Sequence, residues 1–257
     1  MTIALDTIAQ RIAGWFNESQ LVGLGEAHHT PVVMRTLGSL ITEGALGAQC
    51  RDLVVEFGAQ RHQSLVDDYL AGAPLGAAQL APLWRQSAHG TLWAHPVYAA
   101  LLRRLRAYNL SRPAHQRFRV WLAEPDGCTG DKPAPLARSA AFAELIQRQL
   151  LDQGRRALLL FGMRHLALSP INQRPSLAWQ LRQEGATLRT LWPELPPRCA
   201  PFHSSATRLR LIDFSAARYA SVAHTHVAPW GGTAQPLGQL CSGLLRIPGA
   251  HRPLRTH

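Results

Sequence analysis

The ten residues Leu21-Val22-Gly23-Leu24-Gly25-Glu26-Ala27-His28-His29-Thr30 indicate the fold of this sequence most clearly. The apolar run at 20–24 has the length of a buried β-strand. Gly25 follows this run, and a glycine permits a sharp exit where a side chain would obstruct the turn. One acid and two histidines then occupy positions 26–29. Because ligands bind at the carboxyl ends of strands in open α/β sheets, this stretch predicts a polar site at such an end.

Strand-like runs and amphipathic helical patterns alternate along most of the chain. Apolar runs predict strands at 20–24, 52–57, 118–122, 156–161 and 187–191, with weaker candidates at 209–212 and 244–247. Helical spacing predicts helices at 3–16, 32–46, 61–70, 76–87, 96–110, 136–153 and 176–184. This alternation predicts an α/β fold with a mainly parallel central sheet flanked by helices on both faces.

The same pattern suggests how the chain is divided. We expect a single α/β domain over residues 1–257. A helical segment at about 60–110 interrupts the strand–helix alternation and is expected to cover one edge of the sheet as an inserted cap. The region at about 195–257 is rich in proline and glycine, and we expect it to be largely irregular, with a frayed tail from Pro248.

Composition narrows the class of protein. The chain is 46% hydrophobic and 17% charged, which is typical of a folded globular protein. Its formal charge of +11 comes from 27 basic and 16 acidic residues, and Lys132 is the only lysine. The arginines are scattered and no basic run alternates with aromatic residues, so we expect no nucleic-acid partner. A small-molecule substrate is expected instead, and an anionic one stays open.

The sequence also bears on the cellular compartment. No stretch approaches the ~20 apolar residues of a membrane span. The first six residues contain Asp6 and no basic residue, unlike a signal peptide, so we expect a bacterial cytoplasmic protein without a membrane partner. None of the four cysteines, at positions 50, 128, 199 and 241, forms a CxxC pair, and we expect isolated thiols. The sequence leaves the oligomeric state open.

Polar side chains follow four of the predicted strands. These are Glu26 with His28 and His29, then Glu56, Glu124 and His165. The carboxyl ends of neighbouring parallel strands lie at one edge of a sheet, so we expect these side chains to face one crevice. His95 precedes Pro96 at a predicted helix start and is expected to point into this crevice from the cap.

Such a cluster can do two kinds of chemistry. Carboxylates held close cannot all ionise cheaply, and a histidine beside a carboxylate becomes oriented and more basic, so the group can deprotonate water. Alternatively, mixed histidine and glutamate ligands suit a divalent transition metal. Taken alone, Glu56 is explained equally well by an ion pair with Arg51 or Arg61. Glu124 alone is better explained by a turn, and His165 alone by a backbone contact at a strand end.

At these residues the chain resembles the erythromycin esterase-like and ChaN-like superfamily. The first match is 25–30, since the esterases carry Gly-Glu-Ala-(Thr or Ser)-His-Gly and the ChaN-like haem-binding proteins carry Gly-Glu-x-His. The second and third are 54–56 and 157–165. The segments at 52–58, 65–72 and 93–98 are similar to uncharacterised bacterial members. One departure is Thr30, which stands where the esterases have glycine.

The esterase branch implies a hydrolase that activates water against an ester-like small substrate, with no required cofactor. Glu26 and His29 would then act together as the general base that activates water. Glu56 would position the water or hold His29, and His165 would complete the pocket. The resemblance further implies that Arg35 contacts an anionic group or the oxyanion.

Other residues at the crevice are expected to bind rather than react. His28, Glu124 and His95 are assigned to the substrate on the esterase reading.

The other branches imply a bound group. The ChaN-like reading makes the protein a haem- or metal-binding protein without catalysis, with His28 as its histidine. A distantly similar Gly-x-x-His class implies a metal-dependent peptidase-like enzyme or lyase. A divalent metal would then be held by Glu26, His28, Glu56 and His165.

Overall fold

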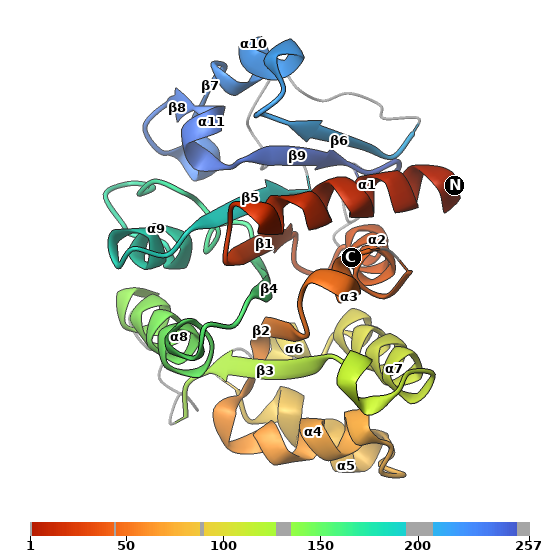
Figure 1. Ribbon diagram of the computed structural model, residues 1–257. Coiled ribbons are helices and arrows are strands. Elements are labelled where there is room, and N and C mark those ends of the chain that lie inside the picture. The colour runs from red at the N-terminus through yellow and green to blue at the C-terminus, as the bar shows by residue number, and fades with distance from the viewer. Residues whose placement is uncertain (1, 44, 88–89, 127–134, 194–207, 251–257) are drawn as a thin grey trace.

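A seven-stranded sheet forms the centre of the computed structural model, which describes residues 2–43, 45–87, 90–126, 135–193 and 208–250 (Figure 1). The strand order is β3-β2-β4-β1-β5-β9-β6. Every neighbouring pair is parallel except β6 and β9, which are antiparallel. The strands are β1 (Leu21–Glu26), β2 (Asp52–Ala59), β3 (Arg119–Glu124), β4 (Ala157–Gly162), β5 (Leu188–Trp192), β6 (Arg210–Asp213) and β9 (Gly243–Arg246). The predicted mainly parallel α/β fold is confirmed.

Helices cover both faces of this sheet. Alternate residues of β1 show why, because Leu21 joins one buried apolar cluster and Val22 joins the other. The first face carries α1 (Thr2–Gly14), α2 (Pro31–Glu43), α3 (Leu46–Gln49), α4 (Gln63–Ala71), α5 (Ala77–Arg85), α6 (Gly90–Trp93) and α7 (Pro96–Leu110). The second carries α8 (Pro135–Gln149) and α9 (Leu177–Gln183), seen on the opposite side in Figure 1.

The shorter elements lie mostly toward the end of the chain. They are α10 (Ala220–Ala223), α11 (Leu237–Leu240), β7 (His226–Val227) and β8 (Gln235–Pro236). Short 3₁₀ helices occur at Trp15–Asn17, Gln60–His62, Ala114–Gln116, Leu151–Gln153, Ala217–Tyr219 and Pro229–Gly231.

The region predicted to be irregular, from about residue 195, is only partly described. Residues 208–250 contribute the two strands β6 and β9 to the sheet, near the predicted 209–212 and 244–247. Residues 194–207 and most of the tail from Pro248 lie outside the described residues. Cys50 and Cys241 are buried free thiols, as predicted, whereas Cys128 and Cys199 also lie outside. Among the helices described, none has the length and apolarity needed to cross a membrane.

The segment predicted as a helical cap, at about 60–110, contains four α-helices, one short 3₁₀ helix and no strand in its described part. α7 packs along α2 and also against α4, while α4 lies beside the edge strand β3 (Figure 1). The start of α7 and the residues before it reach the carboxyl end of β1, where Tyr98 contacts Glu26. This segment therefore supplies side chains to the predicted site.

The first strand ends later than the sequence predicted. β1 continues through Gly25 to Glu26, and the turn comes after it, where His29 adopts a φ of 59°. Gly25 is needed for close packing and not for a turn, because a Cβ there would lie 2.9 Å from the carbonyl oxygen of Leu191. Glu26 is consequently the last residue of a buried strand and is held rigidly.

We expect Gly25→Ala to destabilise the protein by about 1–3 kcal/mol, the usual cost of overpacking a filled interior. The matched control is Gly14→Ala, since a Cβ at Gly14 would meet no atom within 4 Å. That change should alter the free energy of unfolding by less than about 1 kcal/mol. Urea denaturation of both variants checks this. Equal stability of the two variants would contradict the packing role of Gly25.

Candidate functional site

Three neighbouring strands bring the predicted acids together. β4 lies between β1 and β2, and Glu26 on β1 is in register with Gly162 at the end of β4. Glu56 on β2 accepts a hydrogen bond from the Gly162 backbone N–H with its Oε2, at 2.8 Å. Glu26 and Glu56 are 3% and 2% exposed. The expected meeting of polar side chains at one edge of the sheet thus occurs around Gly162.

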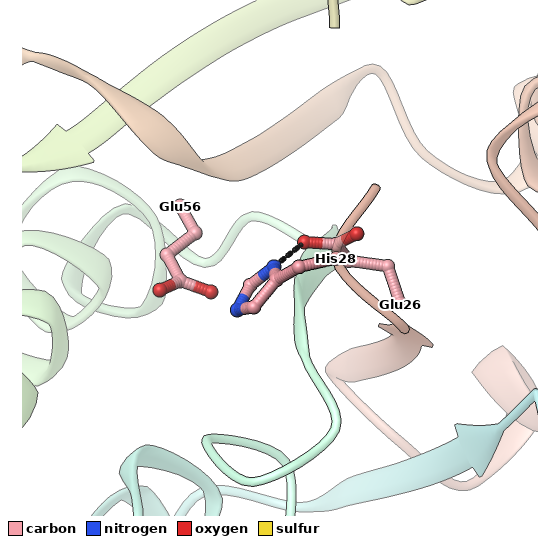
Figure 2. A group of neighbouring side chains, drawn as sticks. All are labelled: Glu26, His28 and Glu56. Carbon is pink, nitrogen blue, oxygen red and sulfur yellow. Dashed lines mark hydrogen bonds and ion pairs between the residues drawn. The ribbon is translucent and has the colours of Figure 1, made fainter. Parts of the chain in front are cut away.

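Glu26 binds His28, the first of the two adjacent histidines. The Nδ1 of His28 is hydrogen-bonded to Oε1 of Glu26, and Figure 2 shows the opposite ring nitrogen directed toward Glu56. The Tyr98 hydroxyl donates a second hydrogen bond to the same Oε1, at 3.3 Å. Because an ionised carboxylate can only accept, Nδ1 carries the proton and Nε2 is left as an acceptor. This is the arrangement of a general base.

The charges around His28 favour its protonated form. Burial alone would lower the pKa of His28, but the hydrogen bond to Glu26 and the negative charges of Glu26 and Glu56 outweigh it. The net result is a pKa above the ordinary 6.5. The Trp93 indole covers the ring edge-on, with centroids 5.4 Å apart, and so fixes its orientation.

Glu56 has a second set of contacts, with the predicted pocket residue His165 and with Arg138, which the sequence analysis did not single out. Its Oε1 lies 3.1 Å from a terminal nitrogen of Arg138 and 3.3 Å from Nε2 of His165. Burial alone would raise the pKa of Glu56, but His165, Arg138 and His28 together hold it well below its usual range. Glu56 is therefore an ionised carboxylate at neutral pH.

Arg138 joins Glu56 to Glu124. It donates to Glu124 through Nε at 2.8 Å and through a terminal nitrogen at 2.6 Å, a fork-like pairing. Glu124 is fully buried, and this burial raises its pKa despite the pairing. The predicted substrate-binding residue Glu124 thus contacts Arg138. The sequence did contain a sign that Arg138 is buried, because Arg138 lies on the same apolar stripe of its helix as Phe142 and Ile146. An arginine at such a position needs a buried acid as its partner.

His29 does not join this cluster. Its Nε2 lies 2.8 Å from the carbonyl oxygen of Leu92, and its ring stacks on His95 with centroids 4.7 Å apart. The predicted pairing of Glu26 with His29 is therefore wrong in its geometry. The reason is the turn that follows β1, in which the Thr30 backbone N–H donates to the carbonyl oxygen of Ala27. His29 adopts a φ of 59° in this turn, and its ring lies against Leu92 and His95 instead of Glu26.

Two further predicted residues lie where the cap meets α2. His95 stacks on His29 and accepts a hydrogen bond from the backbone N–H of Val97, 3.4 Å away, at the start of α7. Arg35 lines a groove between α2 and α7 and makes none of the contacts described for Glu26 or Glu56. Their expected contact with a substrate stays a prediction.

Two buried polar atoms next to His28 lack partners. Among the described residues, Glu26 Oε2 and the indole nitrogen of Trp93 make no hydrogen bond. Buried polar groups are nearly always paired, so these atoms point to a water or ligand bound beside His28. One ligand atom each from Glu26, His28 and Glu56 also lie within 4.8 Å of one another, close enough to hold a metal ion.

Comparison with solved structures shows which known proteins have a similar fold. No family model matches the sequence, and no curated protein is significantly similar to it. A mutant of erythromycin esterase EreC in its open conformation is similar in structure, with a TM-score of 0.63, 10% identity, and 94% and 93% of the two chains covered. The chain shares the fold of erythromycin esterase. The predicted resemblance to the erythromycin esterase-like proteins is confirmed at this level.

Other solved structures are also similar. A succinoglycan biosynthesis protein gives a TM-score of 0.64 at 9% identity, over 93% of this chain and 90% of that chain. ChaN of Campylobacter jejuni, crystallised with haem, gives 0.42 at 11% identity, over 72% and 84% of the two chains. The last score is too low to carry an argument about haem.

Proposed function

We propose that this protein is a hydrolase in which the Glu26–His28 pair activates water for attack on an ester-like small substrate. The hydrogen bond between Glu26 and Nδ1 of His28 carries the proposal, because it leaves Nε2 as a base facing Glu56. An esterase has the same fold, which makes ester hydrolysis the first reaction to test. The proposed substrate is a small molecule, and the proposed reaction requires no cofactor.

The proposed chemistry follows from these positions. A water between Nε2 and Glu56 gives a proton to His28 as its oxygen bonds to the ester carbonyl carbon. The ester C–O bond then breaks, and the leaving alcohol takes the proton back from His28, so acid and alcohol are the products. Glu26 stabilises the transient imidazolium. Arg138 and His165 keep Glu56 ionised and fixed, and so act as positioning residues.

The pH dependence of hydrolysis tests this proposal. His28 must be neutral to accept a proton, so kcat/KM for 4-nitrophenyl butyrate should rise with pH through an apparent pKa above 6.5. Glu26→Gln removes the negative charge that raises the pKa of His28 and weakens the hydrogen bond to it. The rise in kcat/KM should therefore move to lower pH, and the maximum value of kcat/KM should fall. If the rise in kcat/KM has an apparent pKa below 6.5 that is the same in the wild type and in Glu26→Gln, the assignment of His28 as the base is wrong.

Divalent metal binding is the second candidate. The close approach of Glu26, His28 and Glu56, with one unpartnered carboxylate oxygen, fits the ligands of a transition metal. Such a metal would lower the pKa of a bound water. Against this, both Glu56 oxygens already have partners, on Arg138, His165 and Gly162. His165 therefore fits the role of a partner to Glu56 better than that of a ligand.

Metal analysis separates the two candidates. On the hydrolase proposal, chelator-treated protein keeps its activity, and added manganese, cobalt or zinc does not increase it. Stoichiometric metal that is lost in Glu56→Gln would favour the second candidate. A haemin titration tests the ChaN-like alternative, which expects a Soret band that disappears in His28→Ala.

A further inference from the structure

A groove of about 510 Å³ runs between α2 and α7, separate from the Glu26–His28 pair. Its volume falls in the range of about 300–1,000 Å³ that small-molecule sites occupy. The floor is apolar and buried, and it includes Met34, Val97 and Leu101. The groove can therefore hold the apolar body of a small ligand.

The rim of this groove is positively charged. Arg35 and Arg103 are exposed on opposite helices, and Arg104 also lines the groove. Among the described residues that line it, none is acidic. Arginine forks match the oxygens of carboxylates and phosphates, so the charge of this groove complements an anion.

The packing of the two helices helps to form this charged rim. A Cβ at Gly38 would lie 3.2 Å from Cδ of Arg104 and 3.4 Å from Cδ1 of Leu101. The missing side chain at Gly38 thus makes room for the stem of Arg104 to cross α2. A larger residue at position 38 would push Arg104 away and narrow the groove.

The groove ends next to the candidate site. His95 lines it and stacks on His29, the residue after His28 in the chain. A ligand that reaches this end of the groove would therefore lie against His95, whose ring contacts the residue next to His28.

We propose that the α2–α7 groove binds a small organic anion, with its carboxylate or phosphate on Arg35 and Arg103 and its apolar body on the floor. This site goes beyond the proposed hydrolysis, because its occupancy is measured by binding alone.

Isothermal titration calorimetry with octanoate and octyl phosphate, both below their micellar concentrations, tests the proposal. Both anions should bind the full-length protein, whereas octylamine should not. The double variant Arg35→Gln/Arg103→Gln should weaken binding by at least about tenfold, since each loses a charge-assisted hydrogen bond. Arg85→Gln is the matched control, because Arg85 is an exposed arginine on α5 outside the groove, and it should bind like the wild type.

Two more variants locate the ligand. Ala100 is exposed and lines the groove, so Ala100→Trp should fill it and abolish binding without removing a charge. Glu26→Gln should leave binding unchanged, which keeps this result separate from the proposed hydrolysis. No binding of either anion, equal binding of octylamine, or loss of binding in Glu26→Gln but not in the double variant would overturn the proposal.

Discussion

Replacement of His28 by alanine is expected to reduce kcat/KM for 4-nitrophenyl butyrate by about 10²–10⁴-fold, the usual contribution of a general base. The physical reason is that, among the histidines of the described residues, His28 is the one with one ring nitrogen on Glu26 and the other facing Glu56. His29 is the matched control because it is the adjacent residue, has the same side chain, and bonds the carbonyl oxygen of Leu92. His29→Ala should keep kcat/KM close to that of the wild type.

The measurement needs a check on folding. Circular dichroism and urea denaturation of both alanine variants show whether a loss of activity reflects chemistry. Equal losses in the two variants, or a loss confined to His29→Ala, would contradict the assignment. The latter result would restore the pairing that the family resemblance implied, through a rearrangement of the turn at 27–30.

The largest effect on stability is expected for Arg138→Met. Arg138 is the only cation among the described contacts of Glu124, and it also pairs with Glu56. Its removal leaves the buried Glu124 without a counter-charge and takes one of the partners of Glu56, and breaking a buried pair in this way typically costs about 3–5 kcal/mol. Urea denaturation at neutral pH measures this as a change in the free energy of unfolding.

An exposed ion pair provides the control. Arg119 lies 3.4 Å from Asp67, with side-chain exposures of 45% and 37%. Arg119→Gln should therefore cost only about 0–1 kcal/mol. Adding Glu124→Gln to Arg138→Met should recover part of the lost stability, because it removes one uncompensated charge. If Arg138→Met lowers the free energy of unfolding no more than Arg119→Gln does, the contacts of Arg138 with Glu56 and Glu124 do not stabilise the site.

Much of the fold could be predicted because its signals are local. The seven sheet strands fall close to the predicted runs, and the helix at 96–110 has the predicted bounds. The insertion of β4 between β1 and β2 could not be predicted, since it depends on long-range pairing of Leu21 with Ala157 and of Asp52 with Ala157. The same pairing brings Glu56 to Gly162 and builds the site.

Which of the two histidines, His28 or His29, contacts Glu26 also could not be predicted from the local sequence. After β1 the direction of each side chain is set by the turn at 27–30, in which His29 adopts a φ of 59°. The sequence predicted an end at Leu24, whereas packing of Gly25 against Leu191 extends the strand to Glu26. Arg138 was missed for a related reason, because its partners Glu56 and Glu124 come from distant strands.

The central claim, that Glu26 and His28 form the base, is tested most directly by an NMR titration of the His28 imidazole. This measurement needs no substrate. We predict that His28 titrates above 6.5 in the wild type and that its pKa falls in Glu26→Gln, because the hydrogen bond and the negative charge that raise it are weakened. A His28 pKa at or below 6.5 in both proteins would contradict the account.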